Sequence, residues 1–119
     1  MAYDPNNIFA RILRGEIPNR TVYDDDFALA FHDINPQAPI HVLVIPKGAY
    51  TDLADFGARA TPDELAGFFR AVAAVAAQLG IVEPGFRALC NTGSDAHQEV
   101  PHFHVHLFAG APLGPMLAR

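Results

Sequence analysis

Residues 40–47, IHVLVIPK, constrain the fold of this chain more than any other stretch of its sequence. The run is rich in β-branched residues and almost entirely apolar. Such a run is typical of a central strand that is covered on both faces, because a strand with one wet face alternates apolar and polar residues. The rest of the chain must therefore supply neighbouring strands for both edges and covering layers for both faces.

Four further segments have strand character. Residues 21–25 and 27–34 are joined by the acidic turn Asp24–Asp26, and residues 86–91 form another short segment. Residues 102–108, HFHVHLF, alternate histidine with apolar residues. Because successive side chains of a strand point to opposite faces, the apolar set can seal a core while the histidines share the other face.

Residues 62–79 are predicted to form the main helix. Thr61 can cap it, Pro62 suits its first position, Glu64 completes a capping box and Gly80 can end it. A shorter helix is predicted in NNIFARILRGEIP, where either asparagine can be the cap and a glycine can end the helix.

Residues 48–60 are predicted to be an irregular connection with one helical turn near Leu53–Phe56. Five strands and two segregated helices predict an α+β fold built on a five-stranded antiparallel sheet. With 119 residues, the chain fits a single domain over 1–119.

Charge and hydropathy argue against several classes of function. The net charge of −5 and the lack of a Lys/Arg cluster disfavour binding to duplex nucleic acid. The most apolar stretch, LAGFFRAVAAVAAQLGIV, is interrupted by Arg70, Gln78 and two glycines, so we expect no membrane span. The lone Cys90 cannot form an internal disulfide, and MAYDPNNIF lacks the basic and apolar regions of a secretory signal. We therefore expect a cytoplasmic protein.

Three of the six histidines, His102, His104 and His106, alternate in the last predicted strand. Such an array suits either metal binding or a histidine that acts as nucleophile or acid–base. The outer two would lie about 13 Å apart at their Cα atoms, whereas metal-bound nitrogens lie about 2 Å from the ion. A metal site would therefore need His41 or a carboxylate in place of an outer histidine, and we predict no metal. Structural imidazoles on a half-exposed strand are the remaining alternative.

HFHVHLF resembles the H-x-H-x-H-x-x motif of the histidine triad (HIT) family. NIFARILRGEIP, YDDDFALAFHDINPQAPIHVLVIPK and NTGSDAHQEV resemble, in the same order, blocks of the Hint branch of nucleoside phosphoramidases. The resemblance covers nearly the whole chain. It implies a HIT-like fold whose sheet extends across a homodimer, and a hydrolase that releases AMP or GMP from nucleoside 5′-phosphoramidates without a cofactor.

The resemblance also implies roles for four histidines. His104 would be the nucleophile, and the nucleotide would be transferred to it before water releases the product. The main-chain carbonyl of His102 would hold the His104 ring, and the His102 side chain would pair with His41. His106 would contact the phosphate oxygens and assist the leaving group.

A nucleotide-binding set follows from the same resemblance. Asp33 would accept hydrogen bonds from the ribose hydroxyls, and Asn91 would hold ribose or phosphate. The base pocket would be lined by Phe9, Phe31, His32 and Ile34, and the phosphate loop would contribute His97, Gln98 and Glu99.

The chain departs from the family pattern at three places. His97 stands where glycine is common, Glu99 stands where several members carry a hydroxyl, and the tail lacks the tryptophan of some relatives. These departures leave the preference for a leaving group open.

Two alternatives to the phosphoramidase remain. One is a dinucleoside polyphosphate hydrolase or a nucleotidyltransferase of the same superfamily, although those branches carry glutamine where this chain has Asn91 or His106. The other is a nucleotide-binding regulatory protein without catalysis.

Overall fold

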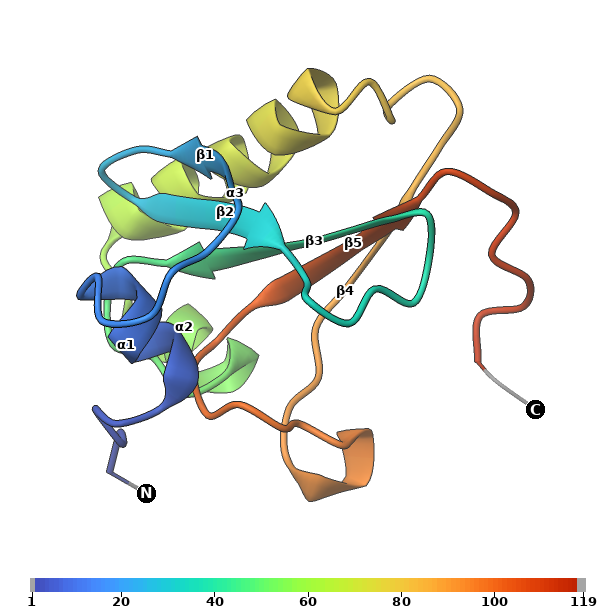
Figure 1. Cartoon of the computed structure of the whole chain (residues 1–119). Coiled ribbons are helices and arrows are strands. Elements are labelled where there is room, and N and C mark those ends of the chain that lie inside the picture. The colour runs from blue at the N-terminus through green and yellow to red at the C-terminus, as the bar shows by residue number, and fades with distance from the viewer. Residues whose placement is uncertain (1, 118–119) are drawn as a thin grey trace.

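The computed structural model describes residues 2–117, and a five-stranded antiparallel sheet lies at its centre (Figure 1). The strands follow the order β1-β2-β3-β5-β4 across the sheet. Their bounds are β1 Thr21–Asp24, β2 Ala28–His32, β3 Ile40–Pro46, β4 Arg87–Leu89 and β5 Val105–Ala109. The segment IHVLVIPK is the middle strand, so the sequence-based expectation for it is confirmed. Residues 1, 118 and 119 of the predicted domain lie outside the described part.

Three α-helices accompany the sheet in the described part of the chain: α1 Ile8–Leu13, α2 Leu53–Arg59 and α3 Pro62–Gln78. The capping box predicted for α3 is present, since Thr61 accepts from the Glu64 backbone and the Glu64 side chain accepts from the backbone N–H of Thr61. The sequence predicted only one helical turn where α2 lies. Within residues 2–117, no helix is both long and apolar enough to cross a membrane.

The two faces of the sheet pack against different partners. Val42 and Val44 of β3 face α3, where Phe68 and Val75 belong to the same buried cluster. The alternating residues Leu43 and Ile45 face the opposite side, and they pack with Phe9 and Ile12 of α1 and with Phe31 of β2. The central strand is therefore covered on both faces, as its composition requires.

The last strand is shorter than predicted at its start. β5 begins at Val105, so His102 and His104 precede the strand instead of belonging to it. Phe103 enters the core, where it stacks on Phe56 of α2 with ring centroids 4.9 Å apart. The two-residue alternation nevertheless continues before β5: Phe103, Val105 and Leu107 belong to the same buried cluster, whereas the rings of His102 and His104 both lie edge-on to Phe9 of α1.

Candidate functional site

A cavity of about 580 Å³ opens on the α1 side of the sheet. Its volume lies within the range of small-molecule sites, roughly 300–1,000 Å³. The wall comes from α1, the end of β2, the strands β3 and β5, and the loop before β5. Ten of its lining residues were predicted as site residues, namely Phe9, Phe31, Asp33, Ile34, Asn91, His97, Gln98, Glu99, His104 and His106.

His104 is a buried neutral imidazole with a fixed proton position. Its Nδ1 lies 2.7 Å from the main-chain oxygen of His102, and because a carbonyl only accepts, Nδ1 carries the proton. The lone pair is therefore on Nε2. Burial lowers the pKa of His104 below its usual value of 6.5, so the ring is neutral at pH 7. A neutral imidazole with a free Nε2 lone pair is a nucleophile.

The His102 side chain does not line the cavity. Its Nε2 donates to the oxygen of Pro46 at 3.0 Å, and its Nδ1 accepts from the hydroxyl of Tyr3 at 2.6 Å. Burial lowers the pKa of His102 to about 4, so this ring is also neutral at pH 7. His102 thus contributes its backbone carbonyl to the site and not its side chain.

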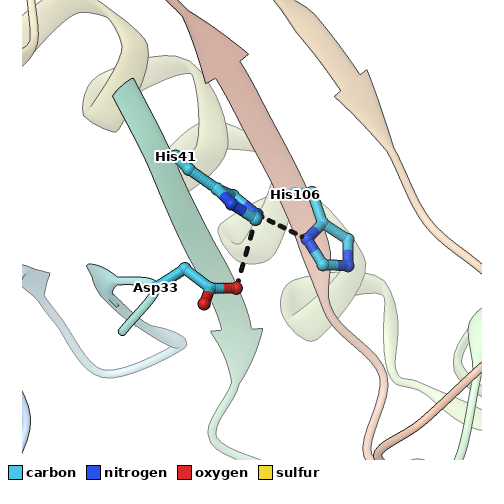
Figure 2. A group of neighbouring side chains, drawn as sticks. All are labelled: Asp33, His41 and His106. Atoms are coloured by element: carbon cyan, nitrogen blue, oxygen red, sulfur yellow. Dashed lines mark hydrogen bonds and ion pairs between the residues drawn. The ribbon is translucent and has the colours of Figure 1, made fainter. Parts of the chain in front are cut away.

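His41 pairs with His106, and the predicted pairing of His41 with His102 is wrong. His41 Nε2 lies 2.9 Å from His106 Nδ1 and 3.4 Å from Asp33 Oδ2 (Figure 2). The backbone N–H of Gln37 donates to His41 Nδ1 at 3.1 Å. That bond leaves the proton of neutral His41 on Nε2, from which it is donated to His106.

The proton of His106 consequently lies on the opposite nitrogen from the one that His41 contacts. Because His106 Nδ1 accepts, a neutral His106 carries its hydrogen on Nε2. Burial, with smaller contributions from His104 and His41, lowers the pKa of His106 to about 4. The His104 and His106 rings are 4.9 Å apart, so a lone pair and a hydrogen-bond donor belong to neighbouring rings of the cavity.

Asp33, His41 and His106 also form a cluster that could hold a metal ion, since one donor atom of each lies within 4.8 Å of the others. The donor set of two imidazoles and a carboxylate suits zinc. A metal would, however, have to displace the proton shared between His41 and His106. The two histidine nitrogens that would bind the metal are therefore already joined by a hydrogen bond.

The loop before β5 is organised by Gln98. Its side-chain amide donates to the backbone oxygens of Thr51 and Val100, and its oxygen accepts from Gly93 N–H. The amide therefore shapes the loop, and these three bonds use the polar groups that the sequence-based prediction assigned to a nucleotide.

The two unusual residues of the loop lie at its exposed rim. His97 has φ 59° and ψ 43°, the left-handed conformation that glycine adopts without strain. Its Nε2 lies 3.0 Å from Glu99 Oε1, and the two side chains are 88% and 75% exposed. Both residues line the cavity.

His32 is the one predicted base-pocket residue that does not line the cavity. Side chains on a strand alternate, so His32 points away from the side that Phe31 and Asp33 share. Sequence reasoning also missed Tyr3 and Gln37. Nothing in the sequence marks a backbone N–H as the partner of a histidine, while a tyrosine distant from the motif carries no spacing signal.

Comparison with known proteins identifies the family of the chain. The family model of the HIT domain matches residues 14–113. The chain is 66% identical over 117 residues to a 13.2 kDa HIT-like protein of Azospirillum brasilense, covering 98% of this chain and 96% of the relative.

It is 46% identical over 112 residues to the purine nucleoside phosphoramidase of Escherichia coli K12, covering 94% and 93%. A solved HIT family hydrolase of Clostridium thermocellum superposes with a TM-score of 0.86 at 37% identity, covering 95% of this chain and 97% of that one. The chain therefore belongs to the HIT domain family.

Proposed function

We propose that this protein hydrolyses the P–N bond of purine nucleoside 5′-phosphoramidates, with a nucleotide bound covalently to His104 as the intermediate. The observation that carries the proposal is the complementary proton placement in two adjacent rings. His104 offers a lone pair on Nε2, whereas His106 offers a hydrogen on Nε2. The similarity to the E. coli purine nucleoside phosphoramidase supports the choice of substrate.

In the first step His104 Nε2 attacks the α-phosphorus and the P–N bond of the substrate breaks. The amine leaves with a proton taken from solvent, which reaches it through the open side of the cavity. The His104 ring becomes a cation, because Nδ1 keeps its hydrogen while Nε2 bonds to phosphorus. The carbonyl of His102, 2.7 Å from Nδ1, stabilises that charge.

His106 acts in this scheme as a hydrogen-bond donor to a non-bridging phosphoryl oxygen. Its pKa of about 4 leaves it neutral at pH 7, and a neutral imidazole that gave up its Nε2 proton would become an anion beside Asp33. Donation without transfer of the proton avoids that charge. The donor is aimed at the oxygens on which negative charge accumulates.

In the second step a water molecule attacks the phosphorus of nucleotidyl-His104. The P–Nε2 bond breaks, the electron pair returns to Nε2, and the water loses a proton to solvent. Over both steps, one water supplies the hydroxyl of the nucleotide product and the proton of the amine. Neither step requires a cofactor.

The remaining lining residues are proposed to hold the nucleoside. Phe9 and Phe31 provide aromatic walls for a purine, with ring centroids 5.6 Å apart in an edge arrangement. Asp33 is only partly buried, and its carboxylate can accept hydrogen bonds from two vicinal hydroxyls. Asn91 and Ile34 complete the rim of the pocket.

The test is release of AMP from adenosine 5′-phosphoramidate in excess EDTA. We expect turnover by the wild type and a loss of at least about 10³-fold in His104→Ala. The variant should still bind AMP, which shows that the cavity is intact. Turnover only after zinc is added would replace this mechanism with a metal-dependent one.

Diadenosine polyphosphate serves as the competing substrate. If it is cleaved faster than the phosphoramidate, the protein is a dinucleoside polyphosphate hydrolase. AMP binding without turnover of either substrate would make it a nucleotide-binding protein that lacks this catalysis.

The proposal includes a homodimer in which the sheet continues from one copy to the next. β4 is the last strand in the order across the sheet, so its outer edge is available for pairing with a second β4. The strand is three residues long. Phe86, next to this edge, is 38% exposed. Sedimentation equilibrium measures the mass of the particle, and a monomer at micromolar concentration would refute the dimer.

A further inference from the structure

We propose that Tyr3 is a positioning residue for the nucleophile. Its hydroxyl holds the imidazole of His102, and the main-chain carbonyl of that same residue orients His104. The inference rests on the proposed function for its effect on rate, but its structural part can be tested without any substrate.

The segment that carries His102 and His104 needs anchors outside the sheet. β5 begins only at Val105, so the ladder between β3 and β5 does not hold the preceding residues. The backbone N–H of Phe103 donates to the oxygen of Tyr50 at 2.7 Å, and that N–H belongs to the same peptide group as the His102 carbonyl. This peptide therefore has one backbone anchor, and the His102 side chain provides the others.

The His102 ring is held at both of its nitrogens. Nε2 donates to Pro46, at the end of β3, and Nδ1 accepts from Tyr3. The residue is only 1% exposed, so water cannot easily replace the hydroxyl. A buried acceptor without a partner is costly. Without the hydroxyl, we expect the His102 ring to rotate so that Nδ1 accepts a hydrogen bond from another donor. This rotation would displace the main-chain carbonyl of His102.

The residues that directly follow Tyr3 form an ordered turn. The backbone N–H and the side-chain amide of Asn7 both donate to the oxygen of Asp4, and Arg14 donates to the oxygen of Pro5. The Tyr3 and His102 rings meet edge to face, with centroids 5.7 Å apart. The hydroxyl is therefore presented by an ordered segment.

Tyr3 is not among the residues that line the cavity. Its loss should consequently affect the reactivity of His104 and leave the affinity for nucleotide unchanged. A residue that only stabilises the fold would change neither quantity once the protein is folded. A residue that contacts the substrate would change the affinity.

The experiment compares Tyr3→Phe with Tyr23→Phe. Tyr23 is a matched control, because its hydroxyl also makes one hydrogen bond, to Asp25 at 3.0 Å, and it does not line the cavity. Single-turnover formation of AMP from adenosine 5′-phosphoramidate should slow about tenfold in Tyr3→Phe, the equivalent of one hydrogen bond. The dissociation constant of AMP should match the wild-type value in both variants, and Tyr23→Phe should react at the wild-type rate.

Long-range ¹H–¹⁵N spectra of the imidazoles provide the second readout. In the wild type they should report hydrogen on Nδ1 of His104 and on Nε2 of His102. In Tyr3→Phe the His104 nitrogens should shift toward the average of the two tautomers, while the backbone amide spectrum shows that the variant is folded.

Unchanged His104 nitrogens in folded Tyr3→Phe would overturn the proposal, whatever the rate. An unchanged rate would equally overturn it, provided that the wild type is active. If the wild type cleaves neither substrate, the proposed function fails, and the spectra alone still decide whether Tyr3 orients His104.

Discussion

Folding stability should fall steeply between pH 7 and pH 5, and His102 should account for a defined share of the loss. Burial lowers the pKa of this imidazole from 6.5 to about 4 in the folded protein, and unfolding restores the usual value. The unfolded state therefore binds the proton first as the pH falls. The contribution of His102 to stability is complete above pH 6.5 and is lost progressively as the pH falls toward 4.

The size of this share follows from the same two pKa values. The unfolded and folded pKa values of His102 differ by about 2.5, and each pKa unit corresponds to about 1.36 kcal/mol. The largest possible contribution of His102 to the free energy of unfolding is therefore about 3.4 kcal/mol. At pH 5 the unfolded residue is almost fully protonated while the folded one is mostly neutral. About 2 kcal/mol of this contribution is therefore lost between pH 7 and pH 5.

The assay is urea unfolding at both pH values and at one protein concentration, for the wild type and for His102→Gln. Glutamine does not titrate, and its amide can still donate to Pro46. The variant should be less stable at pH 7, but its loss between pH 7 and pH 5 should be about 2 kcal/mol smaller than the wild-type loss. His97→Gln, which changes an exposed side chain, is the control and should lose as much as the wild type. A difference below about 0.5 kcal/mol for His102→Gln would refute the argument that this ring is buried neutral.

Three further changes test other parts of the structure. Asp33→Asn should raise KM for the phosphoramidate about tenfold and reduce the preference for ribose over 2′-deoxyribose; an unchanged preference in steady-state kinetics would remove Asp33 from the ribose site. His41→Phe should lower kcat about tenfold at constant KM, because His106 loses the donor that fixes its tautomer; an unchanged kcat would show that the pairing is dispensable. Gly67→Ala should cost about 1–3 kcal/mol in urea unfolding, because its Cβ would lie 2.3 Å from the Phe27 ring. Gly57→Ala, in a helix and with nothing within 4 Å, should gain about 0.5–1 kcal/mol as its matched control, and equal effects of the two alanines would contradict the packing argument.

Much of the fold could be predicted because its signals are local. Thr61 and Glu64 mark the start of α3 within four residues, and the apolar run of β3 identifies the middle of the sheet. Helix α2 was missed because its signals are weak. It has seven residues including Gly57, and its N-cap Asp52 resembles an ordinary loop aspartate until the bond to Asp55 N–H is seen.

The candidate site could be predicted less completely, because its hydrogen bonds join segments that are distant in the sequence. Alternation correctly places His106 on the other face of β5 from the buried Leu107. It also places His102 on the α1 side, where its ring lies near Phe9, but it does not show that this side chain bonds to Pro46 and Tyr3 and does not line the cavity. Spacing alone does not indicate where a strand begins.

The register of β3 against β5 explains why His41 contacts His106 and not His102. His41 lies opposite Phe108, and Leu43 lies opposite His106, so His41 and His106 are diagonal neighbours on one face. An antiparallel partner runs the other way, and residues before β5 must therefore lie near the end of β3. His102 indeed contacts Pro46, five residues from His41, which is about 17 Å along an extended strand. Once the two strands are known to be antiparallel neighbours, the pairing of His41 with His102 is excluded by distance, and His106 is the triad histidine that His41 can reach.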